Sequence, residues 1–189
     1  MFYGCGMLID VPHAPEQTSQ QTSQQTPPQS CVDTPGSPLC AADVARGTIR
    51  MLLRHDLVAL SEVPLDGNRR ADLMAIDARG QIVIVEIKVS RADLLGDSKW
   101  TEYLGCCDRY YWAVPAGFDA SPLEREGFLP ERTGIIIADR YDAAIQREAH
   151  TDPLSAATRK RVTLAFARRA ARRMIALTDP EADGLAFRT

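Results

Sequence analysis

The segment that decides the fold is RRADLMAIDARGQIVIVEIKVS, residues 69–90. It predicts a β-hairpin, two strands joined by a turn in which Gly80 takes the left-handed conformation. Side chains alternate between the two faces of a strand, and both faces of residues 82–89 begin apolar, so we expect a central strand covered on both sides. Glu86 and Lys88 share one face of it. Burying two charges costs several kcal/mol unless they are paired, hydrated or bound to a cation, which indicates a functional cleft.

The turn also predicts the register of the hairpin. If Asp77 pairs with Gln81, Asp72 lies directly opposite Glu86. Opposed residues on antiparallel strands have Cβ atoms about 4.5–5.5 Å apart and point to one face. Two carboxylates at that distance repel each other and favour a divalent cation between them, and hard oxygen ligands suit Mg²⁺ or Mn²⁺. A shift of one residue would send the two acids to opposite faces.

The sequence around the hairpin resembles a known family. An Asp, a hairpin and then Glu-x-Lys at the end of a buried strand resemble the PD-(D/E)XK nuclease superfamily, although Ala71 stands where that pattern has proline. The resemblance implies that Asp72 and Glu86 hold a metal and that Lys88 positions or activates the attacking water. Residues 45–150 are similar to the MmcB family of bacterial DNA-repair proteins. The similarity rests on GNRRADLMAID (67–77) and IVIVEIKVSRADLLGDSKWTEYLGCCDRYYWAVP (82–115).

Composition and length predict one globular domain. The chain has 189 residues, 45% of them hydrophobic, without an apolar run long enough to span a membrane or a secretory signal. We expect a tail at residues 1–40, one nuclease-like domain at residues 41–178 and a flexible end at residues 179–189. Five cysteines without a CxxC spacing fit neither a disulfide framework nor a zinc site, which favours the cytoplasm. For a bacterial DNA-repair family, this implies association with the nucleoid.

The tail contains tandem QTSQ repeats at residues 17–24 and several prolines. This composition predicts disorder, because too little apolar surface is available to offset the entropy of ordering. Two interpretations remain open: the tail recruits other repair proteins, or it is dispensable.

Periodicity predicts the remaining elements. Helices are expected at residues 41–55, 91–106 and 155–177, and further strands at residues 57–65, 109–114, 133–139 and 143–148. The order indicates an α/β domain with a mixed central β-sheet flanked by helices. The family resemblance implies that this sheet is restriction-endonuclease-like.

Other residues are candidates for the same site. If the turn before the hairpin centres on Gly67, Glu62 faces Asp72 as a third acid; the alternative is an edge-strand surface residue. Two arginines at the hairpin end either reach a phosphate near the cleft or are solvated: Arg69 and Arg70. The resemblance implies auxiliary polar residues on the next helix, against the alternative of a hydrated face and core aromatics: Asp97, Lys99 and Tyr103.

The last helix is strongly basic. Residues 155–177 carry seven basic residues and no acidic ones, and Arg161, Arg168 and Arg172 share one face. This imbalance favours a polyanion such as DNA over docking onto the acidic body of the domain. An apolar stripe from Val162 to Leu177 is expected to pack on the domain.

These observations favour one function and leave two alternatives. The favoured hypothesis is a Mg²⁺-dependent DNA endonuclease that hydrolyses phosphodiester bonds in DNA-damage repair or tolerance. The first alternative is a nuclease-like module that binds DNA or a repair partner without cutting it. The second is an adaptor whose tail and basic helix recruit partners.

Overall fold

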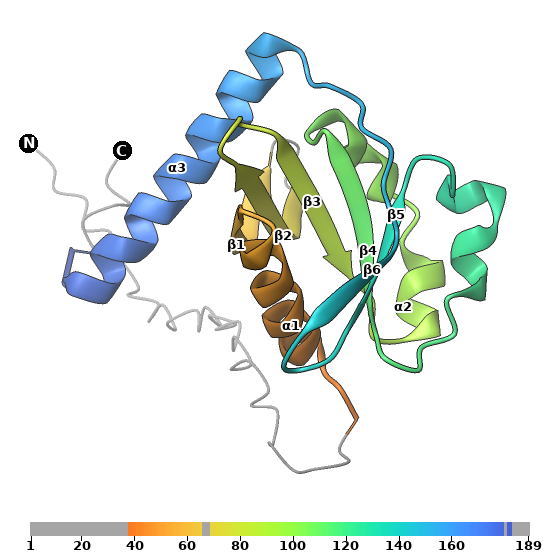
Figure 1. The fold of residues 1–189 in the computed structure, drawn as a ribbon. Coiled ribbons are helices and arrows are strands. Elements are labelled where there is room, and N and C mark those ends of the chain that lie inside the picture. The colour runs from red at the N-terminus through yellow and green to blue at the C-terminus, as the bar shows by residue number, and fades with distance from the viewer. Residues whose placement is uncertain (1–37, 66–68, 180, 183–189) are drawn as a thin grey trace, which may run out of the picture. The chain divides into compact units, whose positions relative to one another are not determined.

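A single six-stranded sheet organises the computed structural model, which describes residues 38–65, 69–179 and 181–182 (Figure 1). The spatial order of the strands follows the chain. They are β1 (Leu57–Leu65), β2 (Arg69–Asp77), β3 (Ile82–Ile87), β4 (Arg109–Pro115), β5 (Gly134–Ala138) and β6 (Ala143–Arg147). Strands β1 to β3 pair antiparallel, β3 to β5 pair parallel, and β6 returns antiparallel to β5. The predicted mixed sheet is therefore confirmed.

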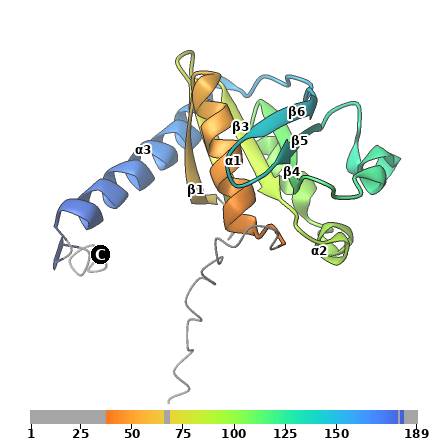
Figure 2. The same ribbon diagram turned by 60° about the horizontal axis from the view of Figure 1, so that its bottom comes forward.

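Helices cover both faces of the sheet. Helix α1 (Ala41–Arg54) lies across one face, as Figure 2 shows. The other face packs against α2 (Arg91–Gly96), the 3₁₀ helix η1 (Trp100–Gly105) and the first half of α3 (Ala156–Thr178). Two short 3₁₀ turns, η2 (Ser121–Glu124) and η3 (Glu126–Phe128), lie between β4 and β5.

Strand β3 is buried over its whole length, as expected for a central strand. Its side chains alternate between two cores: Ile82 and Ile84 belong to the core under η1, while Val83 and Val85 pack toward α1. By this alternation Glu86 lies on the η1 side of the sheet.

The helix predicted over residues 91–106 is wrong in its extent. Ser90 does cap α2 by accepting a hydrogen bond from the backbone of Asp93, but the α-helix ends at Gly96. Asp97 leaves the helical conformation, and its carboxylate accepts a backbone hydrogen bond from Lys99 at 3.3 Å. Such local side-chain bonds compete with helix continuation. The chain resumes at Trp100 as a 3₁₀ helix.

Helix α3 docks over only part of its length. Val162 is buried and Phe166 packs on the η1-side core, but Met174 and Leu177 are 59% and 78% exposed. Figures 1 and 2 show why: the C-terminal half of α3 continues past the edge strand β1. The expectation of a fully docked stripe is therefore wrong for that half.

Cys40 is disulfide-bonded. The prediction that the five cysteines form no disulfide framework concerns several bonds and is not tested by this single one. Cys106 and Cys107 are thiols outside any disulfide, and burial raises the pKa of the Cys107 thiol, which makes it a poor nucleophile.

Two sequence predictions concern segments that lie mostly outside the described residues. They are the disordered tail at residues 1–40 and the flexible end at residues 179–189. None of the described helices is long and apolar enough to cross a membrane.

Candidate functional site

The hairpin places Asp72 and Glu86 side by side at the end of β3. Leu73 pairs with Val85 and Ile76 with Ile82, so the next rung sets Asp72 opposite Glu86, and the predicted register is confirmed. At this position the two carboxylates accept hydrogen bonds from the backbone N–H groups of the neighbouring strand. The Asp72 backbone N–H donates to Glu86 Oε1 at 3.3 Å, and the Ile87 N–H donates to Asp72 Oδ2 at 2.9 Å. Each carboxylate is thus fixed by the opposite strand.

The charged forms of the two acids are unfavourable in the folded protein. Glu86 is only 4% exposed, and burial together with the charge of Asp72 raises its pKa to about 8. Burial also raises the pKa of Asp72, against the lowering effects of the Ile87 N–H and the charge of Lys88. At neutral pH the pair therefore retains a proton unless another cation replaces it.

Lys88 is buried beside them with partners from α2 and its C-terminal end. Its ammonium lies 2.8 Å from Asp97 Oδ2 and 3.7 Å from Asp93 Oδ1. Burial lowers the pKa of Lys88, but the hydrogen bond to Asp97 and the nearby acidic charges outweigh it, so the pKa is raised and the side chain stays protonated. The ammonium also lies 6.0 Å from the centroid of the Trp112 ring.

This geometry gives Asp97 a role that the sequence alone did not specify. It was expected only as a polar residue near the site, yet it makes the shorter of the two ion pairs that hold Lys88. The signal was present in the pattern Glu-x-Lys followed by a short helix ending in Gly96-Asp97. The role of Asp97 can be inferred from that pattern only when the helix is known to end at Gly96.

Aromatic residues from β4 and η1 surround the acids. The Tyr103 hydroxyl donates to the Arg70 carbonyl at 3.1 Å, and burial, followed by the charges of Glu86 and Asp72, raises its pKa to about 12. Trp112 pairs with Glu86 across β3 and β4. The Trp112 Nε1 and the Tyr110 hydroxyl are buried without a hydrogen-bond partner among the described residues. These side chains form a low-dielectric wall.

Glu62 faces Asp72 in the β1–β2 register but does not join the acid pair. Its backbone has a positive φ of 54°, and its carboxylate forms an ion pair with Arg70 Nε at 2.5 Å. Within the described ranges, three or more His, Cys, Asp or Glu residues nowhere gather closely enough to hold a metal. The charge of Glu62 nevertheless contributes to the raised pKa of Asp72, and the role of Glu62 as a third acid stays a prediction.

The remaining candidates lie at the rim. Lys99 is exposed, and no hydrogen bond or ion pair joins its side chain to another described residue. Arg69 pairs with Glu102 at 2.6 Å, and Arg70, with its side chain 64% exposed, pairs with Glu62. Both arginines are thus engaged in surface ion pairs, which contribute little to stability and are easily exchanged for another anion.

The basic helix borders a groove on β1. Its volume is about 320 Å³, and the three arginines predicted to share a face all line it. The lining residues are Pro64, Arg161, Leu164, Ala165, Arg168, Arg169 and Arg172.

A family model described as DNA repair protein MmcB-like matches residues 29–181. The chain belongs to this MmcB-like family. The match covers the whole sheet, the acid pair and α3, so all the described site residues lie within the family region. A role in DNA repair follows from the family at this coarse level.

The fold of the MmcB-like chain is also found in a solved structure. That protein, from Silicibacter pomeroyi, is described as having unknown function. It is 43% identical, and the similarity covers 78% of this chain and 96% of that chain with a TM-score of 0.67. No curated protein matches.

Proposed function

We propose that this protein is a Mg²⁺- or Mn²⁺-dependent endonuclease that hydrolyses DNA phosphodiester bonds in repair. The observation that carries the proposal is the pair Asp72 and Glu86, two desolvated carboxylates fixed side by side at the end of a buried strand. Lys88, also buried, follows two residues after Glu86. The resemblance to the PD-(D/E)XK superfamily and membership of a DNA-repair family support it.

The donor set fits a divalent cation. Burial raises the pKa of both acids, and the charge of Asp72 further raises the pKa of Glu86, so the doubly charged pair is destabilised. An ion with two positive charges offsets this better than one proton does. Mg²⁺ accepts one or two protein carboxylates and completes its shell with water and phosphate oxygens. Bound there, the cation would polarise the phosphate and lower the pKa of a bound water.

Lys88 would act as a donor of hydrogen bonds rather than as a base. The raised pKa keeps the ammonium protonated at neutral pH, so it cannot accept a proton from water. A protonated Lys88 held by Asp97 can orient the attacking water or stabilise the negative charge that develops on the phosphate.

The test uses purified protein with and without Mg²⁺ or Mn²⁺ on labelled single-stranded, duplex, flap and abasic DNA. We expect metal-dependent cleavage that is lost in Lys88→Ala, Asp72→Asn and Glu86→Gln, each checked for folding by circular dichroism. Full activity in any one variant would refute the role assigned to that residue.

A second candidate is a module that binds DNA without cutting it. The observation that favours it is the arginine-lined groove of α3, which suits a phosphate backbone without any contribution from the acid pair. In that case wild type and Lys88→Ala would bind DNA with the same salt dependence, and neither would cut any substrate in the panel.

A further inference from the structure

The arginines of α3 fall into two groups. Arg159 and Arg173 anchor the helix: Arg159 pairs with Asp108 at 2.6 Å near its start, and Arg173 donates to the Ser61 carbonyl at 2.5 Å in its second half. Arg168 and Arg172 make no hydrogen bond or ion pair with a described residue, and Arg169 Nε is buried without a partner. The second group lies along the groove.

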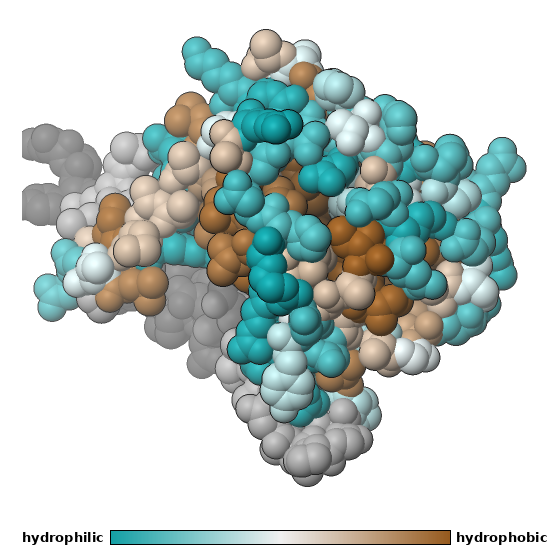
Figure 3. All heavy atoms as spheres, in the orientation of Figure 1, coloured by the Kyte–Doolittle hydropathy of each residue, from teal (hydrophilic) through white to brown (hydrophobic). Residues whose placement is uncertain are grey.

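The floor of this groove is apolar. Leu164, Ala165 and Pro64 line it between the guanidinium groups, and Leu164 is 57% exposed. Positions 161, 164, 165, 168 and 172 form one face of a helix, and Ile175, 48% exposed, continues that face. Figure 3 shows exposed apolar residues in brown and tan along α3 at the left of the view.

The groove lies close to the acid pair. Pro64 pairs with Arg70, two positions along β1 from Glu62, which faces Asp72. Two residues span about 7 Å, and neighbouring strands are about 4.8 Å apart. Phe166 of α3 packs into the same core as Ile84, so the helix that borders the groove covers the side of the sheet on which Glu86 lies. A strand lying in the groove would therefore pass Arg70 and reach Glu86 within a few nucleotides.

We propose that this groove binds unpaired nucleotides of single-stranded DNA and leads the strand to Asp72 and Glu86. That single-stranded DNA is also the cleaved substrate rests on the proposed function, whereas its binding in the groove does not. The arginines match a phosphate backbone, whereas the aliphatic floor matches base faces, which are accessible only when the bases are unpaired. The volume of about 320 Å³ suits a single bound group and is at the lower end of ligand pockets, about 300–1,000 Å³.

The experiment measures binding by fluorescence anisotropy without metal, in Lys88→Ala protein so that no strand is cut. The probes are a 12-nucleotide oligothymidine, a single-stranded 12-mer of abasic sites and a 12-bp duplex. We expect the oligothymidine to bind about tenfold more tightly than either, since base contacts add to phosphate contacts.

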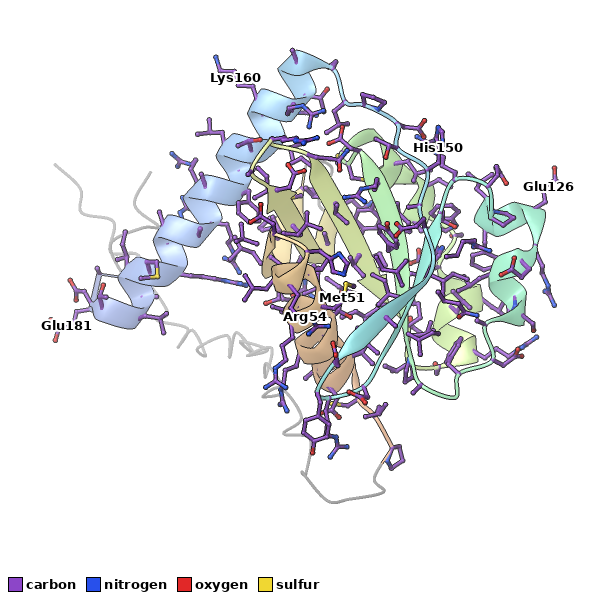
Figure 4. All side chains as sticks on the ribbon, viewed as in Figure 1. Met51, Arg54, Glu126, His150, Lys160 and Glu181 are labelled. Atoms are coloured by element: carbon purple, nitrogen blue, oxygen red, sulfur yellow. The ribbon has the colours of Figure 1, made fainter. Side chains whose placement is uncertain are left out.

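Two groove variants separate the two kinds of contact. Arg168→Gln/Arg172→Gln should weaken binding of all three probes and reduce the slope of log K against log salt by about 1.4, because each single-strand phosphate contact contributes about 0.7. Leu164→Ser should bring oligothymidine down to the affinity of the abasic strand without changing the salt slope. Lys160→Gln is the charge control, because Lys160 points away from the sheet in Figure 4.

Equal affinity for oligothymidine and the abasic strand, or tighter binding of duplex, would overturn the proposal. The proposal would also be overturned if vesicles of anionic lipid bound the wild-type groove more tightly than DNA does and displaced the oligothymidine. This outcome is tested because a basic helix with apolar residues also suits a membrane surface. If the groove variants behave as expected while wild-type protein with metal cuts nothing, the groove stands and the endonuclease proposal fails.

Discussion

The most informative single residue is Glu86, because its raised pKa couples the stability of the fold to pH. The pKa of its carboxyl rises from about 4.5 to about 8 in the folded protein. Between these values the folded state binds more protons than the unfolded state, so the free energy of unfolding decreases as pH rises from about 4.5 to 8. The size of this effect is at most a few kcal/mol, since one pH unit corresponds to about 1.4 kcal/mol per proton.

We therefore predict that Glu86→Gln makes the metal-free protein more stable at pH 8 than wild type, because a neutral amide removes the buried charge. The difference should be smaller at pH 6, where wild-type Glu86 is protonated. Urea unfolding at both pH values measures it. Mg²⁺ should raise the stability of wild type at pH 8 and leave Glu86→Gln unchanged, and Glu126→Gln, at an exposed site, should behave as wild type.

A second prediction at this scale concerns Asp97. Asp97→Asn removes the charge 2.8 Å from Lys88 and leaves the buried ammonium with Asp93 at 3.7 Å. We expect a loss of about 1–3 kcal/mol in the free energy of unfolding and a lowered pKa of Lys88. Asp93→Asn is the matched control, and an equal or larger loss in that variant would contradict the pairing described here.

At the scale of elements, local patterns predicted most of the structure. The hairpin register followed from the turn around Gly80, and the strands followed from apolar runs bounded by turn residues. Two helix predictions failed for other reasons. Helix α2 ends at Gly96 because the Asp97 carboxylate bonds locally to the Lys99 backbone and pairs with Lys88, and Met174 and Leu177 are exposed because α3 continues past the edge strand β1 (Figure 1). The spacing of apolar residues within each helix predicts neither of these features.

The turn itself can be tested. Gly80 has a φ of 79°, a conformation that costs a residue with a Cβ about 1–2 kcal/mol. Gly80→Ala should lower the free energy of unfolding by about that amount, although no atom lies within 4 Å of the added methyl group. Gly96→Ala also has open space but no positive φ, and it should cost much less in the same urea titration.

At the scale of the whole domain, α1 is held against the turn between β5 and β6. A Cβ on Gly47 would lie only 2.5 Å from the Asp142 carbonyl oxygen, and Asp139 O is closer still. Both are backbone atoms, which cannot turn aside as a side chain can. The close approach of helix and turn therefore requires glycine at this position.

Gly47→Ala should consequently destabilise the domain by about 1–3 kcal/mol or more, despite the higher helix propensity of alanine. Thermal unfolding followed by circular dichroism measures the loss. An unchanged or higher melting temperature would show that α1 does not approach the turn as closely as described.

The two anchors of α3 have a consequence for the products of the proposed reaction. Arg159 holds the helix to Asp108 and Gly80, and Arg173 holds it to Ser61, so the arginine groove sits at a constant distance from the acid pair. A helix anchored at these two points keeps the groove at one position relative to the acid pair. An enzyme built this way would cut at a nearly fixed spacing from the nucleotides that the groove holds.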